Sequence, residues 1–130
     1  MKREGNEAWK RILWTDESAV ILTPTHQKIV WVDQGCQIED IYKFKYPKTM
    51  WVWAGISWEG ATKLIFLKWE KGGGFKAQNY QEQVLRKIKD FMSKTVGEGG
   101  MLMEDGSKCH TAKTNVEFRQ LHGIKTYPPK

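Results

Sequence analysis

The sequence has no long apolar run. A transmembrane helix needs roughly 20 consecutive apolar residues, and nothing in the 130 residues approaches that length. The first seven residues, MKREGNE, also lack the apolar centre of a secretory signal peptide. We therefore expect neither export nor a membrane partner.

Cysteine is scarce as well. The two cysteines, Cys36 and Cys109, cannot form the disulfide framework of a small secreted domain, so we expect both to be free thiols. Cys109 is adjacent to His110, with His122 further on, but zinc ligands usually come in separated pairs. The glycines at 72–74 lack the Lys-Ser/Thr of a phosphate-binding loop. No zinc site and no organic cofactor is expected.

The composition is that of one folded domain. A hydrophobic fraction of 40% and seven tryptophans argue against disorder, and 130 residues suit a single core. We interpret 1–130 as one domain that begins with a polar lead at 1–10. Its strands are expected to carry six tryptophans that fill the core: Trp14, Trp31, Trp51, Trp53, Trp58 and Trp69.

Hydrophobic periodicity predicts an antiparallel β first half and a second half in which helices and strands alternate. A helix is expected after 72–74, with Asn79 as its N-cap and Glu82 completing a capping box. The predicted strands are 12–15, 19–22, 28–32, 50–58, 62–69, 101–103 and 124–127, and a second helix is expected from Thr111 to Gly123 with Ala112, Val116 and Leu121 facing inward.

Two of the strand-like runs end on acidic residues, namely ILWTDES at 12–18 and MLMEDG at 101–106. Magnesium prefers oxygen ligands and is usually held by one or two carboxylates, and a pair of such ions drives phosphodiester chemistry. Carboxylates delivered to one edge of a sheet therefore suggest a divalent-metal site. The alternative is that strand ends are acidic because they meet solvent.

Five short motifs occur in a fixed order: WTDES at 14–18, WVWAGIS at 51–57 followed by Gly60, EDG at 104–106, HTAK at 110–113 and YPP at 127–129. In this order and spacing they resemble the catalytic domain of the mariner and Tc-type DDE transposases. The resemblance covers most of the chain, from about residue 9 to residue 130. It implies an α/β fold of the ribonuclease-H-like class, a mixed sheet flanked by helices, with the final helix missing.

The resemblance also implies a function for particular residues. In the family, three acidic residues hold two magnesium or manganese ions for DNA cleavage and strand transfer. Asp16 matches the first acid and Asp105 the second, whereas strand alternation alone does not separate them from Glu17 and Glu104. His110 matches a histidine just after the second acid, near the metal site or substrate, although a polar residue at a helix start is an equal reading.

The family's third acid follows the YPP motif, so we expect this chain to lack it, as it lacks the family's N-terminal helix-turn-helix region. Two-ion chemistry depends on holding both ions at a narrow spacing. We therefore expect weak metal binding and no useful DNA cleavage or joining by this chain alone. Whether it acts as an enzyme is open.

The net charge of +6 is concentrated in the middle of the chain, where 43–94 holds eleven basic and four acidic residues. Phosphate contacts by such residues give salt-sensitive affinity without sequence preference. The candidates for DNA contact are Lys63, Lys68, Lys71 and Lys76, and the alternative is a solvated surface.

Besides DNA, the resemblance implies protein partners and a nuclear location. The segment 23–49 is an insertion between strands that in mariner relatives helps to pair two subunits, so a homodimer or a complex with full-length transposase is expected. The competing hypothesis is a non-catalytic remnant that binds DNA or protein. A third is a fragment with no function of its own.

Overall fold

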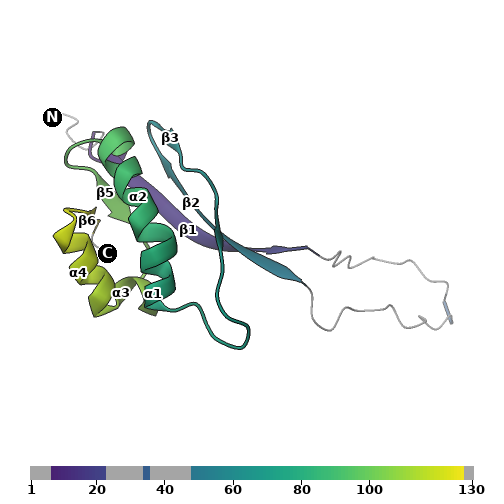
Figure 1. Cartoon of the computed structure of the whole chain (residues 1–130). Helices are drawn as coiled ribbons and strands as arrows, with labels where there is room; N and C mark the ends of the chain where they lie inside the picture. Colours follow the sequence, from purple (N-terminus) through teal and green to yellow (C-terminus); the bar gives the residue numbers. More distant parts are fainter. Residues whose placement is uncertain (1–6, 23–33, 36–47, 128–130) are drawn as a thin grey trace.

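The computed structural model describes residues 7–22, 34–35 and 48–127. They form a six-stranded mixed sheet with helices packed against it (Figure 1). The strands are β1 (Ile12–Ile21), β2 (Thr49–Ser57), β3 (Gly60–Ala61), β4 (Ile65–Leu67), β5 (Met101–Met103) and β6 (Lys125–Thr126). The helices are α1 (Ala77–Tyr80), α2 (Arg86–Phe91), α3 (Lys108–Thr111) and α4 (Lys113–Leu121), and a short 3-10 turn (Trp9–Arg11) precedes β1.

The sheet order is β3-β2-β1-β5-β6, and β4 also pairs with β2. β1 and β2 are antiparallel, whereas β5 runs parallel to both β1 and β6. The parallel pairs are formed by crossovers through α1–α2 and α3–α4, as expected for strands that cannot be joined by a tight turn. Among the described residues, the predicted antiparallel first half is found, and so is the alternation of helices and strands in the second half.

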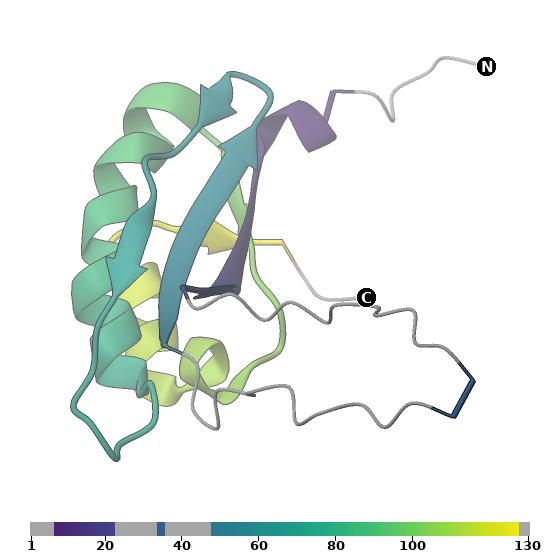
Figure 2. The ribbon, with the colours of Figure 1, turned by 90° about the vertical axis from the view of Figure 1, so that its right-hand side faces the viewer.

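The helices lie on one face of the sheet, as the turned view shows (Figure 2). α1 and α2 belong to one continuous helical run that includes the π-helical turns Gln81–Leu85 and Met92–Val96. Its apolar side packs on the sheet, and the core contains Leu13, Trp53, Leu102, Val84, Leu85 and Ile88. We call the face of the sheet against which the helices pack the covered face. Within the described residues no α-helix lies on the other face of the sheet, which we call the open face.

Several local predictions need correction. The segments 12–15 and 19–22 are one strand, β1, because polar residues between them pair in register with β2 and so keep the backbone extended. The long run of 62–69 is only partly strand, at β4. The predicted strand 28–32 lies outside the described residues, as does most of the 23–49 insertion.

The helix predictions are right in place but wrong in detail. The first helix begins at Ala77, not after Asn79, and the Asn79 side chain instead accepts a hydrogen bond from the Lys76 amide at 2.9 Å. The second is broken by the extended ψ of Ala112 into α3 and α4. Leu121 is 81% exposed; the buried positions of α4 are polar, Asn115 and Arg119.

The tryptophans are mostly not core residues. Trp53 is fully buried and Trp69 packs against the core, but Trp14, Trp51 and Trp58 are exposed. Trp14 and its neighbours lie on the open face, where no helix among the described residues covers them. Trp31 lies outside the described residues.

The helices of the described part of the chain are all too short or too polar to cross a membrane. Cys109 is a free thiol, as predicted, and burial raises its pKa. Cys36 lies outside the described residues.

Candidate active site

The two predicted acids lie at the same level of the sheet, one within β1 and the other just after β5. β1 and β5 are parallel neighbours in which Trp14 pairs with Met103. Asp16 and Asp105 each follow that pair by two residues, so they leave the last paired position of the two strands at the same distance along the chain. The Thr15 hydroxyl donates a hydrogen bond to the Met103 carbonyl at 2.7 Å, which fixes the two strands just before the acids.

In each of these carboxylates, one oxygen has a polar partner and the other has none among the described residues. The Asp105 side chain is 63% exposed, and its Oδ1 accepts from the Ser107 amide at 3.0 Å and pairs with His110 Nδ1 at 2.8 Å. The hydrogen bond from Ser107 is the main cause of a lowered Asp105 pKa. Asp16 is exposed, and its Oδ1 accepts from the Glu17 amide at 2.9 Å. No described residue is recorded as a polar partner of the second oxygen of either acid.

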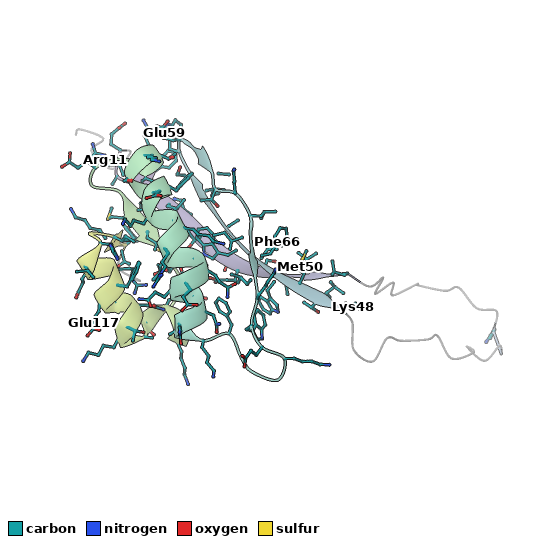
Figure 3. All side chains as sticks on the ribbon, viewed as in Figure 1. Arg11, Lys48, Met50, Glu59, Phe66 and Glu117 are labelled. Carbon is teal, nitrogen blue, oxygen red and sulfur yellow. The ribbon has the colours of Figure 1, made fainter. Side chains whose placement is uncertain are left out.

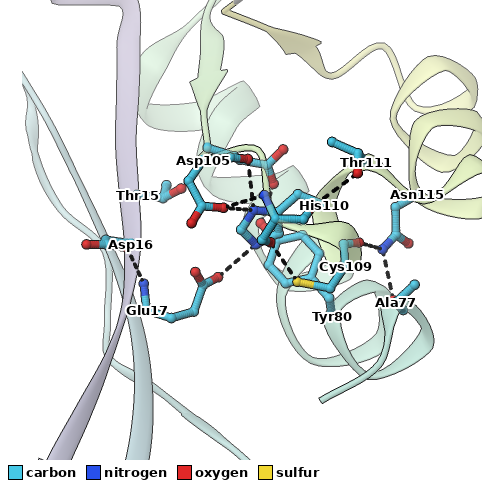
Figure 4. Close-up of polar contacts among 12 residues, drawn as sticks. Thr15, Asp16, Glu17, Ala77, Tyr80, Asp105, Cys109, His110, Thr111 and Asn115 are labelled. Atoms are coloured by element: carbon cyan, nitrogen blue, oxygen red, sulfur yellow. Dashed lines mark hydrogen bonds and ion pairs between the residues drawn. The ribbon is translucent and has the colours of Figure 1, made fainter. Parts of the chain in front are cut away.

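Glu17 points to the opposite side of β1 from Asp16. Figure 4 shows its carboxylate directed at His110, whose Nε2 lies 3.1 Å from Glu17 Oε1. Both side chains are largely buried, with exposed fractions of 4% for His110 and 16% for Glu17. Strand alternation alone did not distinguish Glu17 from Asp16. The structure shows that Glu17 forms a largely buried ion pair with His110.

His110 connects the two faces because it contacts acids from both strands. Burial lowers its pKa, but the hydrogen bond and charge of Glu17, with the charge of Glu104, outweigh burial and raise the pKa from 6.5 to about 9. The imidazolium therefore donates from Nε2 to Glu17 and from Nδ1 to Asp105 at neutral pH. It fixes the orientation of the Asp105 carboxylate and supplies a positive charge beside it.

A second buried ion pair lies next to this histidine. Arg119 Nη1 donates to Glu104 Oε2 at 3.0 Å, and both side chains are less than 10% exposed. Tyr80 donates its hydroxyl to the other oxygen of Glu104. Burial raises the pKa of Glu104, against the lowering effects of Tyr80 and Arg119, and burial also raises the pKa of Tyr80.

Backbone contacts hold α3, and with it His110, in place. Arg119 Nη2 donates to the His110 carbonyl at 2.8 Å, and Asn115 Nδ2 donates to the carbonyls of Cys109 at 2.7 Å and Ala77 at 2.9 Å. Asn115 and Arg119 are the two buried polar residues of α4. They lie one helical turn apart, so both can bond the backbone of α3 from the same side of α4.

The donor set suits a hard divalent cation held by few protein ligands. Asp16 and Asp105 each offer a free carboxylate oxygen, and magnesium is commonly bound by one or two carboxylates with water completing the shell. The described residues contain no cluster of three or more side chains that could hold a metal ion, and Glu17 and Glu104 are paired with His110 and Arg119. A single, weakly bound ion fits this arrangement.

The four candidate DNA-binding lysines do not share one location. Lys63 lines a groove beside α2, while Lys68, Lys71 and Lys76 are exposed along the connection from β4 to α1. The structure does not test their role.

Sequence reasoning missed the buried part of this site. It singled out Asp16, Asp105 and His110, but not the pairing of Glu17 with His110 or of Glu104 with Arg119. One signal was available: Asn115 and Arg119 are four residues apart, on the helix side where apolar residues would be expected.

Comparison of the sequence with protein-family models finds no match, and comparison with curated proteins finds none either. Comparison of the structure with solved structures does find similar folds. The Mos1 mariner paired-end complex with Mn has a TM-score of 0.74 at 18% identity, covering 98% of this chain and 38% of that one. The chain has the mariner transposase catalytic-domain fold.

Two further structures have this mariner fold in different contexts. The Mos1 transposase paired-end complex with left transposon end gives a TM-score of 0.73 at 18% identity. The catalytic domain of Mos1 mariner transposase gives 0.60 at 16% identity, with 98% of this chain and 53% of that chain covered. The present chain thus spans 38% of the first and about half of the second. The expected ribonuclease-H-like mixed sheet flanked by helices is confirmed.

Proposed function

We propose that this chain is a transposase-derived domain that binds DNA and a divalent metal ion, with Asp16 and Asp105 as the metal ligands. The observation that carries the proposal is a pair of carboxylates, on Asp16 within β1 and Asp105 just after β5, that each follow the last β1–β5 residue pair by two residues in a mariner catalytic-domain fold. Structures of Mos1 with Mg and with Mn are among its structural neighbours, which supports Mg²⁺ or Mn²⁺ as the ion.

The ion would supply Lewis-acid stabilisation of charge on a phosphodiester. The acidic residues and the histidine have different roles in this proposal. Asp16 and Asp105 hold the ion through one oxygen each, and His110 orients Asp105 through its other oxygen. In a complete site, where a further acid and a second ion are present, the reaction would be DNA cleavage and strand transfer, that is, transposition and integration.

With Glu17 and Glu104 engaged by His110 and Arg119, the described residues offer two free acids at this position. We therefore propose that the chain alone binds the ion weakly and neither cuts nor joins DNA at a useful rate. Nicking of supercoiled plasmid in manganese that disappears in Asp105→Asn would contradict this part of the proposal.

The test of the metal site uses neighbouring residues as matched variants. Calorimetric titration with Mn²⁺ is expected to show weak binding that is lost in Asp16→Asn and in Asp105→Asn. Asp16 makes no buried contact, so the free energy of unfolding should change by less than about 0.5 kcal/mol in Asp16→Asn, whereas Asp105→Asn also weakens the contact with the buried His110.

Glu17→Gln is the comparison, because it changes the adjacent carboxylate in the same way but on the covered face. It is expected to lower the free energy of unfolding by about 1–3 kcal/mol, since His110⁺ loses a charged partner. It should leave measurable Mn²⁺ binding. Binding that survives in Asp16→Asn but is lost in Glu17→Gln would assign the site to Glu17 and overturn the proposal.

A second candidate function is a non-catalytic domain that binds a protein, with a second copy or full-length transposase as the partner. The observation that favours it is the apolar open face, where Ile56 is 62% and Phe66 51% exposed. Both side chains lie on the open face, which no described α-helix covers; Phe66 is labelled in Figure 3. Light scattering over a range of protein concentrations separates a monomer from a dimer. A nuclear location is part of the proposed function for either candidate.

A further inference from the structure

A groove of about 660 Å³ lies beside the continuous helical run, between the residues that follow β3 and the helix residues 87–95. Its lining includes the apolar residues Trp53, Ile65, Ile88 and Phe91. Three lysines line it, Lys63 from the strand side and Lys87 and Lys94 from the helix side. It is distinct from the position of Asp16 and Asp105, since none of the groove residues belongs to β1 or β5.

The charge of this groove is unbalanced. All three lysines are exposed, and none forms a recorded salt bridge with another described residue. Asp90 is the one acidic residue among those lining the groove. Three unpaired ammonium groups around one carboxylate leave a net positive surface, which attracts a polyanion.

The spacing of the helix lysines suits a repeating anion. Lys87 and Lys94 are seven residues apart, so they lie on the same side of the helix about 10 Å from each other along its axis. Duplex DNA presents phosphates at regular intervals along its length, so two lysines held apart on one side of a helix can each contact a different phosphate. Lysine binds phosphate as a point charge without demanding one orientation, which suits contact with a backbone rather than with base edges.

We propose that this groove is a DNA contact surface in which Lys63, Lys87 and Lys94 bind backbone phosphates. The inference rests on the proposed function, because it takes DNA as the partner, but it concerns a different surface from the metal site. It also differs from the sequence-based selection of lysines, since only Lys63 is common to both.

The test is the affinity for a short labelled DNA duplex, measured by fluorescence anisotropy at several salt concentrations. The triple variant Lys63→Gln/Lys87→Gln/Lys94→Gln is compared with Lys89→Gln/Lys113→Gln/Lys125→Gln, which removes the same charge from exposed lysines outside the groove. Each lost phosphate contact is expected to reduce the slope of log K against log salt by about 0.9. The groove variant should therefore lose about three times that slope and bind on the order of tenfold more weakly, while the control changes little. Thermal melting of both variants checks that they fold.

Asp90→Asn provides a test in the opposite direction. Removing the one carboxylate of the groove should strengthen DNA binding, whereas Glu117→Gln, an exposed acid on α4, should have less effect. Equal losses in the two triple variants, or an unchanged affinity in the groove variant, would overturn the assignment of the groove and leave the proposed function standing. An unaltered chain that bound no duplex would overturn the proposed function together with this inference.

Discussion

Adjacent acidic residues of β1 differ in exposure and in pairing because they lie on opposite faces of the sheet. Asp16, on the open face, is exposed and has a free oxygen, whereas Glu17, on the covered face, is held by the buried His110. The same contrast appears directly after β5, where Glu104 is buried with Arg119 and Asp105 is largely exposed. One pair of neighbouring acids on each strand thus supplies one structural carboxylate and one available carboxylate.

This division has a physical cause. Side chains alternate across a strand, so two successive acids cannot both enter the core, and a charge that enters it must be paired. On the covered face, His110 and Arg119 supply that pairing. The buried network in turn holds Asp105 in place through His110, so the covered face supports the chemistry proposed for the open one.

The largest effect is expected from breaking the buried network at Arg119. In Arg119→Met the Glu104 carboxylate stays buried without its cation, and the His110 carbonyl loses a donor. Removing one partner of a buried ion pair typically costs about 3–5 kcal/mol. Urea unfolding followed by far-UV circular dichroism measures this loss.

The control is Lys113→Met, which breaks the exposed pair with Glu117 on the same helix, where the two atoms are 3.8 Å apart. Exposed pairs contribute less than about 1 kcal/mol. If Arg119→Met were no more destabilising than Lys113→Met, the buried network would not be a main source of stability, and the proposed contrast between the faces would fail.

The next largest effect is a loss of stability at alkaline pH. Because the folded state raises the pKa of His110 from 6.5 to about 9, its protonation stabilises the folded protein. That stability is fully present below pH 6.5 and is lost as the pH rises through 9. A shift of this size corresponds to about 3 kcal/mol.

The free energy of unfolding should therefore fall between pH 6.5 and pH 9, and the fall should be much smaller in His110→Gln. Measurements should end before Tyr80 titrates, since its pKa lies above 10.0. A profile equally steep with and without the imidazole would show that His110 is not the titrating group.

The order of the elements was predictable from the sequence because it depends on local signals. Alternating apolar runs, the glycines at 72–74 and the helical spacing after them are all short-range features. Gly123 was correctly expected to end the second helix: its φ is +66°, and the Ile124 amide bonds the Arg119 carbonyl at 2.8 Å.

The predictions that were wrong concern features that depend on contacts between distant segments of the chain. Whether Trp14 is covered depends on which layer packs over β1, and whether Arg119 is buried depends on Glu104, fifteen residues away in sequence. The site was only partly predictable for the same reason. The acid pair can be selected by resemblance, but that Glu17 turns toward His110 follows from the packing of α3 across the sheet, which no local pattern encodes.

The smallest effect is expected from the same substitution made on the two faces. Ile88→Val removes one methylene from a side chain that is 2% exposed in the core and should cost about 1 kcal/mol. Ile56→Val removes the same group from a side chain that is 62% exposed and should cost almost nothing. The comparison is made by urea unfolding at two protein concentrations, because a partner on the open face would be lost on dilution. If Ile56→Val lowers the free energy of unfolding only at the higher concentration, a second copy covers the open face. The difference between the two faces would then exist in the single chain and not in the assembly.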